Sequence, residues 1–259
     1  MEFTLRRAVL LLLAIAVHTS LARRLPSGIT PCSRNEPDLN ACALRNGRLA
    51  IPILLKGIPS YGLPPFDPLR ISEIRIDDPS SGRQVALDLT MRDVDIVGLR
   101  DISLDSISID LSRKQASWSC SIPRVSLFGN YNASGRVLLL PIKGFGKMNI
   151  TLDDLRLKYK FDYNLAQRGK DGLERINVID NNLEFEVKQR AYLDLENLFN
   201  GERSLSDNTN VFLNENWREM VQELGPPIAQ ALSAAVTQIM SNLSKSVPFN
   251  DIFPDTPVA

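Results

Sequence analysis

Histidine is nearly absent from this sequence, and the sequence also lacks the motifs that are typical of catalytic or cofactor-binding sites. The 259 residues contain one histidine, His18, inside an apolar N-terminal segment. No Gly-x-Ser-x-Gly motif occurs, so a lipase or esterase would have neither a nucleophile elbow nor a histidine base. The acidic pairs Asp77-Asp78 and Asp153-Asp154 lie in polar, turn-like stretches, where solvated surface is the expected role. Gly144-Phe145-Gly146 lacks the rest of a dinucleotide-binding motif. The sequence therefore predicts no enzyme and no cofactor.

A concentrated basic region and a long apolar run are also missing. Without residues 1–22, the chain has 28 basic and 29 acidic residues, with the two signs mixed along it. Nucleic acid and anionic membrane are therefore poor partners, because both require a concentrated positive field. The apolar run from Ala8 to Val17 is about half the roughly 20 residues that a membrane span needs. No membrane span is expected.

That short apolar run has the features of a secretory signal peptide. Arg6 and Arg7 precede it, and the small residues of Ser20-Leu21-Ala22 follow it. Cleavage after Ala22 would release residues 23–259 as a secreted, extracellular chain, whereas the alternative is an ordinary buried N-terminal helix. The released part is long enough for one elongated domain or two small ones.

Cysteine is scarce, with three residues in the chain. In a secreted protein, Cys32 and Cys42 are first interpreted as a disulfide that closes a short loop. Cys120 would then be left over, on the same face of a strand as Trp118 and Ile122. A buried free thiol is the expected role, and pairing between molecules is the alternative. No metal site is expected, because residues 23–259 hold no histidine and no Cys-x-x-Cys pair.

Hydrophobic periodicity divides the rest of the chain into three parts. Residues 37–55 predict a helix whose regular part Pro52 interrupts or ends. After a proline-rich connection, residues 71–195 alternate with a period of two, which indicates a long series of antiparallel, half-buried strands. The breaks between them are expected as turns or bends at the following places: Gly98, Gly129-Asn130, Gly144 to Gly146, and Gly169 to Gly172.

The last part of the chain returns to a helical period. No residue between Glu223 and Lys245 is charged, so a helix here is expected to be covered on most sides. Residues 214–246 would span roughly 50 Å, with a kink near Pro226 and Pro227. A compact globule cannot cover such a rod, whereas a strongly curved sheet can, and it would leave apolar space beside the helix.

The sequence resembles a known family across almost all of residues 23–259. The N-terminal features are Cys32 and Cys42, followed by Gly57-Ile58-Pro59 and Pro64-Pro65-Phe66-Asp67-Pro68-Leu69. The more specific C-terminal features are Asn197-Leu198-Phe199-Asn200-Gly201 and Phe212-Leu213-Asn214-Glu215-Asn216-Trp217, then the helix that ends near Pro248 and Phe249. Together they are similar to the insect juvenile-hormone-binding and takeout family.

The resemblance implies a single α+β domain of elongated shape. A long C-terminal helix would be wrapped by a highly curved antiparallel sheet, around a hydrophobic tunnel for an isoprenoid or other lipid-like ligand such as a fatty-acyl lipid. It also implies that Cys32 and Cys42 are bonded. The chain differs from the moth hormone carriers in lacking a second cysteine pair, since Cys120 is alone. The sequence is therefore most similar to the takeout-like group, whose members are linked to circadian, feeding and chemosensory physiology.

The predicted function is a secreted carrier of a small hydrophobic ligand. The alternative is a signalling or interaction protein whose surface is recognised by a cell-surface receptor. Eight apolar residues are candidates for the tunnel wall, with ordinary core packing as the alternative for each: Phe66, Trp118, Phe145, Trp217, Val221, Leu224, Ile228 and Ile239.

Three N-glycosylation sequons also occur. They begin at Asn132, Asn149 and Asn242. Asn132 and Asn149 are the candidates for modification, whereas Asn242 lies on the helix that is expected to be buried.

Overall fold

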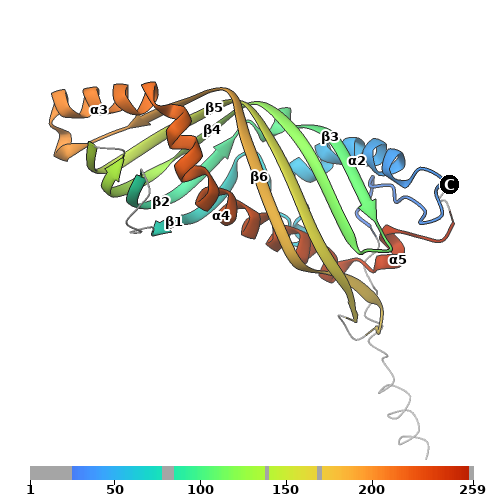
Figure 1. The fold of residues 1–259 in the computed structure, drawn as a ribbon. Helices are drawn as coiled ribbons and strands as arrows, with labels where there is room; N and C mark the ends of the chain where they lie inside the picture. Colours follow the sequence, from blue (N-terminus) through green and yellow to red (C-terminus); the bar gives the residue numbers. More distant parts are fainter. Residues whose placement is uncertain (1–24, 78–84, 138–139, 168–170, 257–259) are drawn as a thin grey trace, which may run out of the picture.

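A curved antiparallel sheet wraps a long helix in the computed structural model, which describes residues 25–77, 85–137, 140–167 and 171–256 (Figure 1). The predicted signal peptide, residues 1–22, lies outside the described residues. The elements, in chain order, are α2 Leu39–Leu55, η1 Pro59–Tyr61, β1 Leu69–Asp77, β2 Val85–Val97, η2 Leu99–Asp101, β3 Ser103–Asp110, β4 Gln115–Val137, β5 Leu140–Gln167, β6 Glu174–Leu195, η3 Phe199–Gly201, α3 Arg203–Glu215, α4 Trp217–Ser246 and α5 Phe249–Ile252. This is the expected α+β architecture.

The sheet has the strand order β1-β2-β4-β5-β6, and all its pairings are antiparallel. β3 pairs with the first part of β4, while β2 pairs with its second part, so β2 and β3 follow one another along the same edge. Gly98, at φ 104°, begins the short η2 turn between them. In Figure 1, α4 crosses the concave side, α3 lies at one end and α2 with α5 at the other. We call these the α3 end and the α5 end.

Three local expectations need correction, because glycine and proline occur inside elements that continue past them. α2 runs through Pro52 to Leu55, since a proline this close to the end removes one helical hydrogen bond without stopping the last turn. Gly129-Asn130 is not a turn but lies inside β4. A Cβ on Gly129 would be 2.9 Å from the Arg92 carbonyl oxygen, beside the bulge of β2. The glycine is thus required by close strand packing rather than by a chain reversal.

Gly144 and Gly146 likewise lie within β5, and their lack of a side chain lets another segment of the chain pack closely against the strand. A Cβ on Gly144 would be 2.5 Å from the Tyr131 hydroxyl oxygen and 2.9 Å from a methyl group of Leu198. The Tyr131 hydroxyl donates to the Glu196 carbonyl at 2.6 Å. The chain after β6 is therefore held against the sheet where the glycines leave room.

α4 is continuous through Pro226 and Pro227, and its axis changes direction along its length in Figure 1. The helix begins at Trp217, three residues later than expected, because Asn216 separates it from α3. Its 30 residues span about 45 Å. α4 contacts both edge strands, β6 and β1, so it closes the gap that the curled sheet leaves open.

The exposed edges of the sheet are protected by side chains from the helices. In α3, Asn210 and Asn214 each bind both the N–H and the carbonyl of one β6 residue, Leu195 and Leu193 respectively. In α2, the side chain of Asn40 accepts from the N–H of Ile109 on β3. Backbone groups that would otherwise invite another strand are thereby paired.

Candidate functional site

A row of aromatic side chains covers the concave face toward the α5 end. Tyr159, Phe161 and Tyr163 alternate along β5 and are all buried. Trp118 on β4 stacks on Tyr159, with ring centroids 5.4 Å apart. The Tyr159 hydroxyl shares a 2.8 Å hydrogen bond with the Thr237 hydroxyl of α4, which ties the row to the helix. The α5 end of the interior is therefore a packed, largely apolar wall.

Burial raises the pKa of two tyrosines in this row. The Tyr159 pKa rises although the hydrogen bond with Thr237 lowers it in part. For Tyr163, burial raises the pKa and the negative charge of Asp110 adds to this effect. Both phenols are thus neutral at physiological pH. The Tyr163 hydroxyl is buried and makes no hydrogen bond with the described residues.

The side of α4 that faces the sheet carries two neighbouring rows of residues at four-residue spacing. Large apolar residues form one row, which we call the inner row: Leu224, Ile228, Leu232, Val236 and Met240. All five are only half-buried. Leu224 and Ile228 pack against a cluster toward the α3 end, whereas Val236 and Met240 pack against the aromatic cluster. Leu232 touches both, so it marks the junction of the two parts of the core.

The second row, which we call the small row, consists of the following residues: Gly225, Ala229, Ser233, Thr237 and Ser241. A Cβ on Gly225 would be 3.1 Å from the ring of Phe185 on β6, so a larger residue would press on the strand. The Ser233 hydroxyl donates to the Asn181 side-chain oxygen at 2.5 Å. The small row thus lets β6 approach the helix and fixes it there.

A cleft of about 990 Å³ runs along this seam. The β6–α4 cleft has buried Gly225, Ala229 and Ser233 on the helix side, with exposed glutamines at its rim. Its lining residues are Asn181, Asn182, Leu183, Glu184, Phe185, Val221, Gln222, Gly225, Pro226, Ala229, Gln230, Ser233, Ala234, Thr237, Gln238 and Ser241. This volume lies at the upper end of the range for small-molecule sites, and amide and hydroxyl groups at the rim could orient a mostly apolar guest.

The eight candidate wall residues do not form one surface. Val221 lines the β6–α4 cleft and also packs against the core. Trp217 is buried in the core at the α3 end, where its indole N–H has no partner among the described residues. Leu224 and Ile228 belong to the inner row. Trp118 belongs to the aromatic row.

Two further candidates, Phe66 and Ile239, are half-buried and belong to neither core cluster. Phe145 needs correction, because it is 57 % exposed. It alternates along β5 with buried Ile142 and Gly144, so its side chain points out from the convex face. Phe145 therefore does not line the interior.

Sequence reasoning overlooked the small row and the β6 side of the cleft. A signal for the small row was present, since residues with short side chains recur at every fourth position from Gly225 to Ser241. The β6 residues carried no such signal. Asn181 and Asn182 look like turn residues in the sequence, and only the pairing with β5 places them beside α4.

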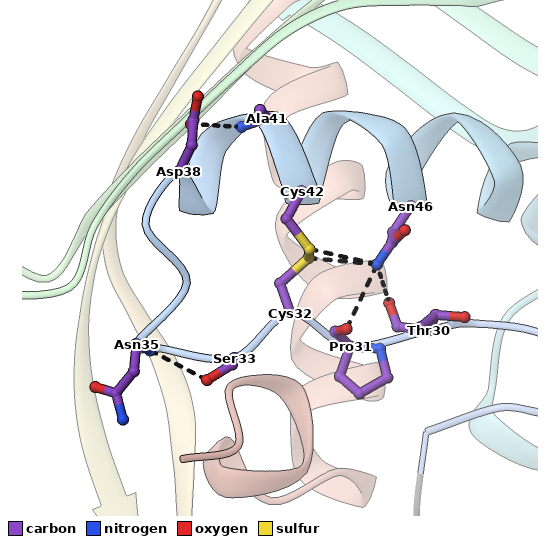
Figure 2. Close-up of a disulfide and its surroundings, with 9 residues drawn as sticks. All are labelled: Thr30, Pro31, Cys32, Ser33, Asn35, Asp38, Ala41, Cys42 and Asn46. Atoms are coloured by element: carbon purple, nitrogen blue, oxygen red, sulfur yellow. Dashed lines mark hydrogen bonds between the residues drawn. A yellow bond between two sulfur atoms is a disulfide. The ribbon is translucent and has the colours of Figure 1, made fainter. Parts of the chain in front are cut away.

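The predicted disulfide is present between Cys32 and Cys42 (Figure 2). The side-chain amide of Asn46 lies against both sulfurs and also donates to the carbonyls of Thr30 and Pro31. Asp38 caps α2 by accepting from the N–H of Ala41. The bridge thereby anchors the N-terminal segment to the first helix.

Cys120 is free and buried, as expected. Burial, with a smaller contribution from Asp105, raises the pKa of its thiol to about 12. A thiol that stays protonated is a poor nucleophile.

Within the described residues, no cluster of histidine, cysteine and carboxylate side chains could hold a metal ion. In that same part of the chain, no helix is long and apolar enough to cross a bilayer.

The sequence matches the family of haemolymph juvenile hormone binding proteins over residues 9–254. The chain belongs to this family. A curated relative, circadian clock-controlled protein daywake of Drosophila melanogaster, is 24 % identical over 244 residues, which cover 92 % of each chain. A putative β-carotene-binding protein of Schistocerca gregaria is 24 % identical over 90 % of this chain and 91 % of its own.

The fold also matches a solved structure. The crystal structure of Takeout 1 from Epiphyas postvittana is similar with a TM-score of 0.76 and 26 % identity, covering 87 % of this chain and 100 % of that one. Two residues of the motifs singled out in the sequence have structural roles here. Asn214 pairs with the edge of β6, and Asp67 accepts from the N–H of Gly98 and from the Arg100 guanidinium.

Proposed function

We propose that this chain is a secreted carrier that holds a small hydrophobic molecule between α4 and the concave face of the sheet. The observation that carries the proposal is the inner row, whose five large apolar side chains face the sheet yet remain half-buried. Apolar surface that the protein leaves uncovered favours any apolar molecule that covers it. In this proposal the ligand enters through the β6–α4 cleft, whose helix side is the small row next to the inner row.

The ligand class follows from the chemistry of the described walls. The inner row and the aromatic row offer hydrocarbon and ring surfaces, while the polar residues that line the adjacent cleft carry hydroxyls and amides, with Glu184 as the one charged residue among the described lining residues. An elongated isoprenoid, carotenoid or fatty-acyl chain suits such walls, consistent with the names of the family and of its locust relative. Burying about 400 Å² of ligand contributes on the order of 10 kcal/mol before association costs of at least about 4 kcal/mol. Micromolar or somewhat weaker affinity is expected, which permits release.

Secretion through residues 1–22 and the absence of turnover belong to the same proposal. The disulfide is consistent with an oxidising compartment. The free thiol is buried and protonated, so it offers no nucleophile to a bound ester. Lipid esters are therefore expected to be recovered unchanged after incubation with the protein.

The test uses the full chain expressed in insect cells and recovered from the medium. Organic extraction and mass spectrometry are expected to yield about one lipid-like molecule per protein. Delipidated protein is then titrated with juvenile hormone, β-carotene and a long-chain fatty acid. A protein that emerges empty and binds none of these three would overturn the carrier proposal.

A variant pair locates the ligand. Leu232→Trp fills the junction of the two core clusters and is expected to weaken binding at least tenfold, whereas volume-conserving Leu232→Met retains it. Glu219→Trp adds the same bulk at an exposed position of α4 and serves as the control. If overpacking unfolds Leu232→Trp, the smaller change Val236→Leu replaces it. Folded inner-row variants with unchanged affinity would show that the ligand does not occupy this space.

A further inference from the structure

The convex face of the sheet carries exposed aromatic rings that no part of the described chain covers. Phe128 on β4 is 43 % exposed and Phe145 on β5 is 57 % exposed. Nearby Tyr192 is 47 % exposed, but the Arg190 guanidinium lies over its ring at 5.6 Å. No described ring or cation stacks on Phe128 or Phe145. Each of these two phenylalanines thus exposes an apolar ring that a neighbouring group could remove from water.

Each of these phenylalanines stands directly opposite a sequon asparagine on the neighbouring strand. In the β4–β5 register, Asn132 pairs with Phe145 and Asn149 pairs with Phe128. Directly opposed residues on one face of an antiparallel pair have Cβ atoms roughly 5 Å apart. Each of the two strands contributes one asparagine and one phenylalanine to these pairs.

Both asparagines have their amide nitrogens available. Asn132 and Asn149 are exposed on the convex face. The Thr151 hydroxyl lies 3.4 Å from the side-chain oxygen of Asn149 and therefore leaves its nitrogen free. Asn242, in the third sequon, differs, since its nitrogen donates to the Gly62 carbonyl at 3.3 Å and Ser244 beside it is buried.

We propose that Asn132 and Asn149 carry N-linked glycans whose first sugars stack on Phe145 and Phe128. The proposal rests on the secretion that the proposed function includes. The amide nitrogen forms a bond to the anomeric carbon of a lipid-linked oligosaccharide pyrophosphate. The bond from that carbon to the phosphate oxygen breaks, the lipid pyrophosphate leaves, and the amide gives up one proton. The C–H face of the first sugar then covers the neighbouring ring.

The stacking explains why the aromatic residues are tolerated on an outer face. Left uncovered, Phe128 and Phe145 would each expose an apolar ring to other chains. Two glycans would cover both rings and keep the convex face hydrated. The carrier site on the concave side would stay clear of them.

Peptide mapping of the full chain secreted from insect cells tests occupancy. Glycans are expected on Asn132 and Asn149 but not on Asn242, and Asn132→Gln and Asn149→Gln should each remove one. A secreted chain with both asparagines bare overturns this proposal alone and would leave the rings for a protein partner. A chain retained unprocessed in the cytosol would overturn the proposed secretion as well.

Double-mutant cycles test the stacking. In the glycosylated protein, Phe145→Ala is expected to lower the folding equilibrium constant by about two- to five-fold. The effect should vanish in the Asn132→Gln background and persist in the Asn149→Gln background, which is the matched control. Phe128→Ala should show the reverse pattern. Equal effects of Phe145→Ala in both backgrounds would overturn the stacking.

Discussion

Single hydroxyl groups decide how the two buried tyrosines of the aromatic row contribute to stability. Tyr159 and Tyr163 lie four residues apart on β5 and are both almost fully buried. The Tyr159 hydroxyl is bonded to Thr237, whereas the Tyr163 hydroxyl has no partner among the described residues. An unpaired buried hydroxyl costs about 1–3 kcal/mol, while a paired one is close to neutral or favourable.

Replacing each tyrosine with phenylalanine should therefore shift stability in opposite directions. Tyr163→Phe is expected to raise the free energy of unfolding of the delipidated protein by about 1 kcal/mol, and Tyr159→Phe to lower it by about 1 kcal/mol. Urea denaturation of the two variants measures both values. If Tyr163→Phe destabilises the protein as much as Tyr159→Phe does, the hydroxyl has a partner in solution, such as water.

At the residue scale, the sequence correctly predicts features that depend on residue type alone. It fails for features that depend on the register of the strands. The Cys32–Cys42 bridge and the free, buried Cys120 needed only the cysteine count and the family resemblance. Phe145 is a large aromatic residue, and the prediction that it lines the interior is wrong because its side chain is exposed. Alternation with a period of two shows which residues share a face of the strand, but it does not show which face is the inner one. That information lies in the pairing with β4.

At the scale of elements, the pattern predicted where strands and helices lie better than where they end. The alternation of residues 71–195 correctly predicts the sheet, but the glycines inside β4 and β5 resemble the turns or bends that separate strands. Those glycines make room for a bulge or for a segment distant in sequence, and such contacts leave no local mark. The position of α3 relative to β6 was equally unpredictable, although the motif around Asn214 was recognised.

Asn214 should be essential to the docking of α3 on β6. Asn214→Asp keeps the acceptor for the Leu193 N–H, but a carboxylate would then face the carbonyls of Leu193 and Asn210, which the amide now binds. We expect the free energy of unfolding to fall by about 2 kcal/mol, with faster amide exchange at the end of β6. Asn208→Asp, on an exposed position of the same helix, is the matched control. Equal stability of the two variants would contradict this role for Asn214.

At the scale of the whole molecule, the two ends of the described chain close the α5 end together. Residues inside the disulfide loop bind the C-terminal segment. The Arg34 guanidinium donates to the Phe253 carbonyl and lies over the Phe249 ring, while Ser33 donates to the Asp255 carbonyl. Figure 1 places α2 and α5 at the same end of the molecule. The disulfide thus holds a loop whose function is to keep the end of the chain against the aromatic cluster.

Removing the bridge should therefore loosen a segment more than 200 residues away in sequence. Cys32→Ser with Cys42→Ser is expected to lower the free energy of unfolding by about 2.5–3 kcal/mol, as estimated from loop entropy. Amide exchange of residues 249–256 should accelerate as well, because the carbonyls of Phe253 and Asp255 lose a fixed partner. Cys120→Ala removes a thiol elsewhere and should leave that exchange unchanged. If stability falls while residues 249–256 stay protected, the disulfide stabilises α2 alone, and the closure of the α5 end depends on α5 itself.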